Sequence, residues 1–487
     1  MKLSQILEGC GISAVRGDAR VDITGITCDS RSVTPGSLFV AVKGAAADGH
    51  RFIGSAVEKG AAAILCQDEP DSIPEDVVLA VASDSRKALA FAADNFYCHP
   101  SRKLELVGIT GTNGKTTTVT LLYNLFRGLG YNCGLLSTIA NYVGTRRSET
   151  VNTTADPITI NRLLAEMVDA GCGYCFMEVS SIGVEQDRVA GLRFRAGIFS
   201  NLTHDHLDYH GTFAEYLRCK KLFFDGLSKD AAAIINVDDK NGRVMVQNCA
   251  ARVVTYSCRS LADHTCRMME ESFEGMLLKI DGREAWTRLI GAHNAYNVLA
   301  IYSTAVELGV APEEALVGLS RLESAPGRLE NIPGPRGISA VIDYAHTPDA
   351  LENVLTTLRS IAPERQLICL FGCGGDRDRT KRPEMAAVAG RLADRIIVTS
   401  DNSRTERTED ILEDIRKGFS AKQLAKCLFI ADRREAIRTA VLTADDRATL
   451  LLAGKGHETY QIIGTEKRHF DEREVLAEIF DNLQTES

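Results

Sequence analysis

A glycine-rich segment between residues 111 and 117 has the composition of a phosphate-binding loop. It reads Gly111-Thr112-Asn113-Gly114-Lys115-Thr116-Thr117 and directly follows an apolar run that ends at Thr110. Apolar residues then recur at helical spacing as far as Leu129, and Gly130 is a typical helix stop. Glycines let the backbone approach an anion, and the N–H groups and dipole of the following helix face it. We therefore expect these seven residues to bind the phosphates of ATP.

Two side chains of this loop suit particular parts of ATP. We expect the ammonium of Lys115 to reach the terminal phosphates and the hydroxyl of Thr116 to hold Mg²⁺. The full phosphate-loop pattern requires a glycine where this chain has Ile109, so the loop is a variant of that pattern. A glycine-rich turn with an incidental lysine is the alternative, but the flanking strand and helix patterns favour ATP binding.

Acidic and histidine side chains beyond the loop are candidates for a metal site. Glu178 ends the apolar run Phe176-Met177, where the sheet of an ATP-binding α/β domain places an acidic metal partner. For this glutamate alone, a surface carboxylate is the more common explanation. The run Asn201-Leu202-Thr203-His204-Asp205-His206-Leu207-Asp208-Tyr209-His210 is poor core material, because each buried polar group needs a partner. It suits a histidine zinc site or, beside ATP, a Mg²⁺ site, and the phosphate loop favours Mg²⁺.

Two further features have ordinary structural explanations. Lys220 lies in a stretch with helical character, and because an ammonium cannot ligate a metal, the residues alone predict a surface lysine. The chain has 14 cysteines, including the pairs Cys172 and Cys175, and Cys369 and Cys373. A zinc site needs four ligands, and a redox pair would open a helix rather than enter a strand. We expect reduced core cysteines.

Short apolar runs alternate with helical patterns along the chain, which is typical of α/β domains with largely parallel sheets. We expect three domains, at residues 1–98, 99–325 and 326–487, with a Pro/Gly loop at 324–327 marking the second boundary. The alternation around Asp281-Gly282 predicts a hairpin over residues 275–290. Expected strands cover residues 37–43, 61–66, 77–82, 104–110, 340–344, 367–371, 395–399, 428–431 and 450–453, and expected helices cover residues 85–97, 294–308 and 312–319.

Composition limits the kinds of partner. The chain has 487 residues, 45% of them hydrophobic, and 56 Lys and Arg against 65 Asp and Glu give a net charge of −9. This balance gives no basic surface for nucleic acid or anionic lipid. No stretch has the length of a membrane span or the pattern of a targeting signal. We expect a cytoplasmic monomer that acts on small molecules, without nucleic-acid partners or membrane insertion.

Motifs in all three expected domains resemble those of one family, the Mur ligase superfamily. They are Asp29-Ser30-Arg31, Thr110 to Thr117, Met177-Glu178-Val179-Ser180-Ser181, Asn201 to Asp208, Gly291 to Asn294, Pro326-Gly327-Arg328-Leu329-Glu330, Asp343 to Asp349, and Ala453-Gly454-Lys455-Gly456-His457-Glu458. The Asp29 motif resembles the uridine-nucleotide domain of the branch that adds the third residue of the peptidoglycan stem. The resemblance implies a uridine-nucleotide-binding α/β domain, a central ATPase domain with a mostly parallel sheet, and a Rossmann-like C-terminal domain that binds the amino acid.

The resemblance also implies an activity. The chain is expected to use ATP to join meso-diaminopimelate to the γ-carboxylate of D-glutamate in UDP-N-acetylmuramoyl-L-alanyl-D-glutamate, through an acyl phosphate. Mg²⁺ is the implied cofactor, and Lys115, Glu178, His206 and Lys220 are the implied catalytic residues. In this family pattern Lys220 is carbamylated, and Thr116, Glu178, His206 and the modified Lys220 are the expected metal ligands. This reverses the surface-lysine interpretation of Lys220.

Substrate contacts follow from the same resemblance. They are Asn294, Arg328 and His346, with the phosphate loop, for ATP; Ser30, Asn152, Thr153, Thr154, Ser180, Gln186 and Arg188 for the uridine nucleotide and its muramoyl-peptide end; and Arg382, Asn402, Ser403, Arg404, Thr405, Gly454 and Glu458 for the incoming amino acid.

The prediction of the third substrate, the incoming amino acid, rests on Arg404 and Glu458. meso-Diaminopimelate carries a distal carboxylate and a distal ammonium, which suit an arginine and a glutamate. L-Lysine lacks the distal carboxylate and is the alternative substrate. Three positions depart from the family pattern: Ser403 stands where diaminopimelate enzymes usually have proline, Ile182 where relatives often have histidine, and His204 where arginine is common.

Three other functions are compatible with parts of the sequence. A ligase similar to folylpolyglutamate synthetase shares the ATP core but lacks the Asp29-Ser30-Arg31 module. A phosphate-loop switch or motor would hydrolyse ATP without an amine, and a non-catalytic UDP-sugar sensor would bind substrate without releasing ADP.

Overall fold

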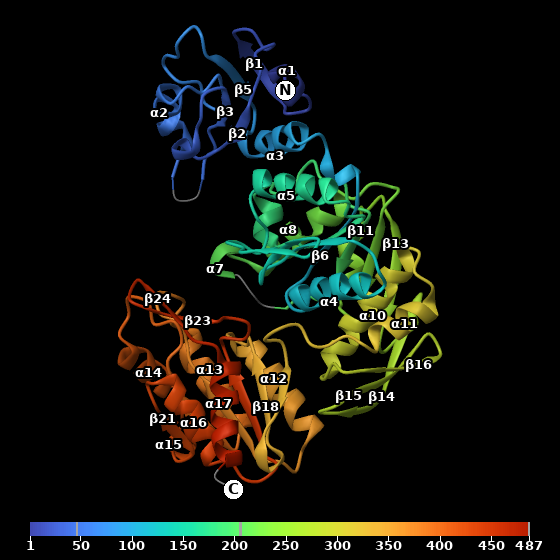
Figure 1. Cartoon of the computed structure of the whole chain (residues 1–487), viewed down its shortest axis with the longest axis vertical. Coiled ribbons are helices and arrows are strands. Elements are labelled where there is room, and N and C mark those ends of the chain that lie inside the picture. The colour runs from blue at the N-terminus through green and yellow to red at the C-terminus, as the bar shows by residue number, and fades with distance from the viewer. Residues whose placement is uncertain (45–46, 204–206, 486–487) are drawn as a thin grey trace. The chain divides into compact units, whose positions relative to one another are not determined.

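The computed structural model describes residues 1–44, 47–203 and 207–485 (Figure 1). Three large sheets and a two-stranded ribbon are flanked by helices, which confirms the predicted three-domain α/β architecture. By contacts the chain forms two compact units, Met1–Thr265 with Asn297–Gly318, and Cys266–Tyr296 with Leu319–Ser487. The predicted domain boundaries differ from this division and stay predictions. None of the helices in the described ranges combines the length and the apolar character that a membrane span needs.

The first sheet lies at the N-terminal end of unit 1, in the strand order β1-β5-β4-β3-β2. Only β1 runs antiparallel, and β3, β4 and β5 are buried along their whole length. One core packs on each face, which explains why these strands appear as continuous apolar runs. The elements are α1 (Leu3–Ile6), β1 (Ile12–Arg16), β2 (Gly25–Thr27), β3 (Ser37–Val40), α2 (Ile53–Glu58), β4 (Ala63–Cys66), β5 (Val78–Ala82) and α3 (Ser85–Phe96).

The second sheet provides the frame of the predicted phosphate site. Its parallel centre has the order β13-β12-β11-β6-β10-β7, and the antiparallel strands β8 and β9 extend it beyond β7. Its strands are β6 (Glu105–Thr110), β7 (Cys133–Leu136), β8 (Asn141–Val143), β9 (Arg146–Ser148), β10 (Tyr174–Glu178), β11 (Ala196–Phe199), β12 (Ala232–Asn236) and β13 (Arg252–Ser257). The helices are α4 (Lys115–Gly128), α5 (Pro157–Asp169), α6 (Ser181–Glu185), α7 (Leu207–His210), α8 (Phe213–Asp225), α9 (Gly242–Met245), α10 (Ala292–Glu307) and α11 (Pro312–Leu319).

The register of this sheet explains which side chains meet. Glu178, the last residue of β10, pairs with Ile109 of β6, and Phe199 of β11 pairs with Thr110. Three carboxyl ends therefore meet where the glycine loop leaves β6. Helix α4 begins directly at Lys115 and packs on β6, β7 and β10, as its apolar spacing predicted.

Unit 2 contains a hairpin and the third sheet. Strands β15 (Gly275–Ile280) and β16 (Arg283–Thr287) are joined by Asp281 and Gly282, both with positive φ, which confirms the predicted turn. The sheet order is β17-β18-β22-β19-β20-β21, with only β17 antiparallel, and a core packs on each face. The other strands are β14 (His264–Ser272), β17 (Glu330–Pro333), β18 (Ser339–Asp343), β19 (Leu367–Phe371), β20 (Arg395–Val398), β21 (Cys427–Phe429), β22 (Thr449–Ala453), β23 (Tyr460–Ile463) and β24 (Glu466–His469). The helices are α12 (Pro348–Ile361), α13 (Lys381–Leu392), α14 (Thr408–Arg416), α15 (Ala421–Leu424), α16 (Arg433–Leu442) and α17 (Glu472–Thr485).

The cysteines form no disulfide, as predicted, but the expectation that all are core residues is wrong for Cys28 and Cys98, which are exposed. All 14 are free, and both close pairs, Cys172 with Cys175 and Cys369 with Cys373, are buried in apolar cores. Burial raises the pKa of Cys373 to about 12, so its thiol stays protonated and unreactive.

One buried ion pair fastens the carboxyl ends of two strands in unit 2. Arg433 and Glu472 are 0% and 1% exposed and approach within 2.7 Å. The same guanidinium donates to the carbonyl oxygens of Ser400, after β20, and Ala453, at the end of β22. Because both charges are removed from water, each depends on the other for compensation.

Replacing Arg433 with methionine should therefore lower the free energy of unfolding by about 3 kcal/mol, since Glu472 would remain as an unpaired buried carboxylate. The neighbouring Arg434 is a matched control, because it pairs with Glu478 at the surface. Arg434→Met should cost less than about 1 kcal/mol. Urea unfolding of both full-length variants measures the difference, and equal losses would contradict this role for Arg433.

Candidate active site

The glycines at the carboxyl end of β6 are required by the backbone. Gly111 has φ +150° and Gly114 has φ +87°. A Cβ on Gly111 would lie 1.9 Å from Ser200 Oγ, and one on Gly114 would lie 2.5 Å from Asn297 Oδ1. Neither position has room for a side chain, so the loop can present its N–H groups closely to a ligand.

The loop is held in place by the segment that follows β11. The backbone N–H of Thr112 donates to Asn201 O at 2.8 Å, and that of Asn113 donates to Asn201 Oδ1 at 2.9 Å. In return, Ser200 Oγ donates to Asn113 O at 2.7 Å. From sequence the motif at Asn201 suggested metal ligands. Within this motif Asn201 holds the phosphate loop, and Thr203 N donates to Thr112 Oγ1 at 3.0 Å. The metal-ligand role stays a prediction, because residues 204–206 lie outside the described part of the chain.

Two lysines converge on one carbonyl of the loop. Lys115 Nζ donates to Gly111 O and Thr112 O, each at 2.8 Å, and Lys220 Nζ donates to Gly111 O at 2.8 Å. Lys220 is 1% exposed and its ammonium lies over the Tyr216 ring. The surface position that the residues alone predicted for Lys220 is wrong, because helix α8 turns this side chain into the core. Two cations therefore face the loop where phosphates would bind.

Glu178 is also buried, at 1% exposure, so the surface-carboxylate interpretation is wrong. Its Oε1 accepts from Thr138 N at 2.8 Å, and no described residue donates to Oε2. Among the described residues no group of three His, Cys, Asp or Glu could hold a metal. His206, with His204 and Asp205, lies outside the described residues. Glu178 and Thr116 supply oxygen ligands at one edge, which suits Mg²⁺, since that ion keeps several waters and binds few protein groups.

Most residues predicted to hold the muramoyl-peptide connect to Glu178 through hydrogen bonds. Thr154 Oγ1 donates to Glu178 O at 2.9 Å and accepts from Ser180 N at 2.9 Å. Arg188 Nη1 donates to Thr154 O at 2.6 Å, and its Nη2 donates to Gln186 Oε1 at 2.7 Å. The structure therefore brings these residues together beside the phosphate loop.

Two predicted residues differ from this group, and one further residue joins it. Asn152 is exposed, and Ser30 lies in a 3-10 helix that is capped by Asp29 and connects β2 with β3 of the first sheet. No described contact links Ser30 to the group around Glu178. The further residue is Tyr209, which was not predicted as a site residue. Its hydroxyl accepts from Gln186 Nε2 at 2.9 Å and donates to Glu185.

In unit 2, the residues predicted to meet ATP gather around Tyr344. The guanidinium of Arg328 lies 4.9 Å from the centre of the Tyr344 ring, and the His346 ring lies 4.7 Å from it. His457 packs against the same ring at 5.0 Å. Tyr344 and His457 were not predicted as site residues, although both fall inside motifs. Asn294 lies in the first turn of helix α10, and its side chain donates to Ile290 O.

The residues predicted to bind the incoming amino acid form a second group in unit 2. Asn402 Nδ2 donates to Glu458 Oε2 at 2.9 Å, and Arg404 Nη1 donates to Gly375 O at 2.9 Å. Gly454 has φ +111°, and a Cβ there would lie 2.7 Å from Asp401 Oδ2. Ser403 is 3% exposed, and Thr405 bonds to Asp376.

The Arg404 loop keeps its shape without a proline. Gly375 N donates to Asn402 O at 2.9 Å. Arg404 has φ +52° and exchanges backbone hydrogen bonds with Ile462 and Gly464 around strand β23. These hydrogen bonds join the backbone on either side of Ser403 to residues of other segments. They therefore hold the loop without a rigid residue at position 403.

The two terminal nitrogens of Arg382 bind protein groups, while its Nε has no hydrogen-bond partner among the described residues. The side chain is 0% exposed, its two terminal nitrogens bind both oxygens of Glu406 at 2.8 and 3.0 Å, and Nη1 also reaches Asp414 at 2.9 Å. Glu406 in turn accepts from Asp376 N at 2.6 Å. A direct contact of Arg382 with the amino acid stays a prediction, and in this geometry Arg382 supports the loops that carry Arg404 and Thr405.

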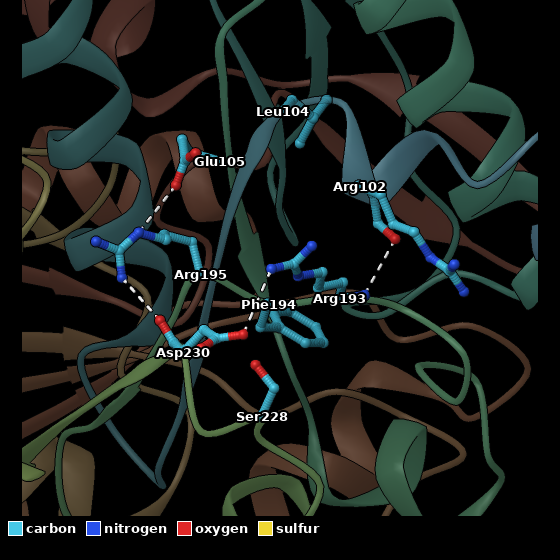
Figure 2. Close-up of a pocket in the computed structure, with 9 residues that line it drawn as sticks. Arg102, Leu104, Glu105, Arg193, Phe194, Arg195, Ser228 and Asp230 are labelled. Atoms are coloured by element: carbon cyan, nitrogen blue, oxygen red, sulfur yellow. Dashed lines mark hydrogen bonds and ion pairs between the residues drawn. The ribbon is translucent and has the colours of Figure 1, made fainter. Parts of the chain in front are cut away.

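A cavity of about 120 Å³ lies at the opposite, amino-terminal edge of the second sheet. Figure 2 shows Arg195 between Glu105 and Asp230, with Nε 3.1 Å from Glu105 and Nη1 donating to Asp230 O at 3.2 Å. Arg193 faces the Asp230 carboxylate at 3.8 Å. Its arginines already face acidic or carbonyl oxygens, so this cavity is not the phosphate site.

The chain matches three family models, and together these cover most of its length. They are the Mur ligase family catalytic domain at residues 22–99, the Mur ligase middle domain at 109–305, and the Mur ligase glutamate ligase domain at 327–456. With the loop clamp and the two lysines at the carboxyl edge of a parallel sheet, these matches define the class. The chain belongs to the Mur ligase family.

Individual proteins and a solved structure are similar to this chain over nearly its full length. The chain is 50% identical over 483 residues to the "UDP-N-acetylmuramoyl-L-alanyl-D-glutamate--2,6-diaminopimelate ligase" of Phocaeicola vulgatus, covering 99% of this chain and 100% of that protein. It is 50% identical over 481 residues to the protein of the same name from Bacteroides fragilis, covering 99% of each. A solved structure of a ligase with this name has a TM-score of 0.71 at 30% identity and covers 99% of each chain.

The phosphate loop gives a direct test of its geometry. Gly111→Ala should abolish nucleotide binding, because the new Cβ would clash with Ser200 and displace the loop. Gly128→Ala, at the last position of helix α4, is the control, since a Cβ there meets nothing within 4 Å. It should leave binding unchanged and stabilise the fold by about 0.5 kcal/mol. Calorimetric titration with ADP measures both, and normal binding by Gly111→Ala would contradict the clamp.

Proposed function

We propose that the chain joins meso-diaminopimelate to the D-glutamate γ-carboxylate of UDP-N-acetylmuramoyl-L-alanyl-D-glutamate at the expense of ATP. The names of the relatives that match over nearly the full length support this reaction. The phosphate loop and the Glu178 group supply a place for ATP and the peptide end. The folylpolyglutamate, motor and sensor alternatives have no comparable support.

The reaction proceeds through an acyl phosphate. The γ-carboxylate attacks the γ-phosphate of ATP, ADP leaves, and the amine of the diamino acid then attacks the acyl carbon. A tetrahedral intermediate collapses and expels phosphate, with one proton lost from the attacking amine. Lys115 releases its loop carbonyls and turns to the transferring phosphoryl group, where its charge stabilises the transition state.

Mg²⁺ fits the oxygen donors of this edge. Glu178 and Thr116 would hold it, together with His206 and a carbamylated Lys220, whose added carboxylate would replace an ammonium that cannot ligate. The ion would neutralise charge on the phosphates. Lys220 already lies 2.8 Å from the loop carbonyl of Gly111, so the modified side chain would sit beside the phosphate loop.

Polar atoms of the second group in unit 2 support meso-diaminopimelate as the third substrate. Among the described residues nothing accepts from Arg404 Nη2 or Nε, and nothing donates to Glu458 Oε1. One cationic fork and one carboxylate oxygen are thus available for a distal carboxylate and a distal ammonium. L-Lysine would leave the fork of Arg404 unpaired, which favours meso-diaminopimelate.

The setting follows from the substrates. UDP-linked precursors and ATP are cytoplasmic metabolites, so we place the reaction in the cytoplasm. All the substrates are small molecules, and the proposed site uses residues of one chain. We therefore propose that a monomer is active.

The catalytic core is tested by Lys115→Ala. This variant should form no UDP-linked tripeptide detectable by mass spectrometry, while binding of the UDP-linked dipeptide stays within about twofold, because Lys115 acts on the phosphoryl group. Lys103→Ala, an exposed lysine before β6, should form product at the normal rate. Product formation by Lys115→Ala at a near-normal rate would contradict the catalytic role of Lys115.

The diamino-acid subsite is tested by Arg404→Met. Loss of a charge-assisted pair should raise KM for meso-diaminopimelate about 30-fold or more, with KM for ATP unchanged. Arg407→Met is the matched control, since this arginine is 76% exposed three residues further on, and its kinetics should not change. An unchanged KM for Arg404→Met would show that the distal carboxylate binds elsewhere.

A further inference from the structure

Lys455 is a fully buried lysine among the residues of the proposed amino-acid subsite. It follows strand β22 between two glycines and is 0% exposed. Its ammonium lies 3.0 Å from Glu458 Oε2, 3.3 Å from Asn402 Oδ1 and 3.9 Å from Asp401 Oδ1. Burying a lysine is costly unless partners compensate its charge, and here two of the three partners are predicted substrate ligands.

The contacts of Lys455 fix the orientation of Glu458. Oε2 of this carboxylate receives both the Lys455 ammonium and the amide of Asn402. The amide is fixed in turn, because Asn402 Oδ1 accepts from Ile462 N at 2.9 Å. With Oε2 held by two donors, Oε1 is the oxygen left to meet a ligand, and its direction is set by the protein.

The charges of this cluster leave one negative charge uncompensated. Asp401 and Glu458 carry two negative charges against the single positive charge of Lys455. Burial alone would raise the pKa of Asp401, but the charges of Lys455 and Arg433 hold that pKa below its usual value, so Asp401 stays ionised. Arg433 is itself neutralised by Glu472, and His346 faces Asp401 more weakly. A cluster with one excess negative charge suits a ligand that brings one ammonium.

We propose that Lys455 is a positioning residue that sets specificity for the distal ammonium of the diamino acid. This inference rests on the proposed function. Lys455 aims Glu458 Oε1 at the ligand and cancels one of the two carboxylate charges, so the subsite takes one cation. Without Lys455, the carboxylates of Asp401 and Glu458 repel one another, and Glu458 turns away from the ligand.

The test compares two amino acids that differ only at the distal amine. KM is measured for meso-diaminopimelate and for 2-aminopimelate, which has the distal carboxylate but no distal ammonium. Lys455→Met should raise KM for meso-diaminopimelate about 30-fold and KM for 2-aminopimelate less than about threefold. KM for ATP and kcat at saturating substrate should stay near normal, because Lys455 touches neither ATP nor the reacting atoms.

Lys467→Met is the matched control. Lys467 is an exposed lysine whose ammonium lies 4.0 Å from the centre of the Tyr460 ring, and Lys455 lies 5.7 Å from the same ring. Its loss should change neither KM. A double variant completes the test: in a Glu458→Gln background, Lys455→Met should add less than about threefold, because its effect acts through Glu458.

Equal losses for the two amino acids, or an undiminished effect of Lys455→Met in the Glu458→Gln background, would overturn the proposal and leave Lys455 a structural residue. If Lys455→Met does not fold, Lys455→Gln keeps a donor without the charge, and an unchanged preference for meso-diaminopimelate would then overturn it. Failure of the unaltered chain to release ADP with meso-diaminopimelate would instead refute the proposed function, so the two failures are distinguishable.

Discussion

The carbonyl oxygen of Gly111 is the point on which the phosphate site depends. A strand ends there, the backbone turns through a conformation that glycine adopts, and the ammonium groups of Lys115 and Lys220 both donate to that oxygen in this structure. Neighbouring strand ends supply the support, since Asn201 bonds to the loop and Glu178 lies one strand away in register. A parallel sheet brings these residues together, because the carboxyl ends of all its strands lie along one edge.

In unit 2 the main constraint is that buried cations need carboxylate partners. Arg433 with Glu472, Arg382 with Glu406, and Lys455 with Glu458 each place a cation at 0% exposure against a carboxylate. Such pairs add little net stability compared with apolar packing, but breaking one is costly. These pairs matter because they fix the orientation of the loops and side chains that could recognise a diamino acid.

Local pattern predicted much of the fold and of the phosphate site. The buried parallel strands appear as apolar runs, the hairpin turn at Asp281-Gly282 is specified by its residues, and helix α4 follows its apolar spacing. Burial of isolated charges could not be predicted this way. Lys220 and Glu178 each look like surface residues in sequence, because what buries them is a helix or a strand pairing distant along the chain. The same holds for Arg382, whose partners Glu406 and Asp414 lie 24 and 32 residues away.

The central claim is that this chain activates a carboxylate with ATP and captures it with meso-diaminopimelate. It is tested most directly by ADP release from the unaltered chain with ATP and UDP-N-acetylmuramoyl-L-alanyl-D-glutamate, in the presence of meso-diaminopimelate, of L-lysine, or of no amine. Sustained release with meso-diaminopimelate alone is the result we expect. Equal release without any amine would contradict the claim and indicate a simple ATPase, and preference for L-lysine would refute the assignment of Arg404.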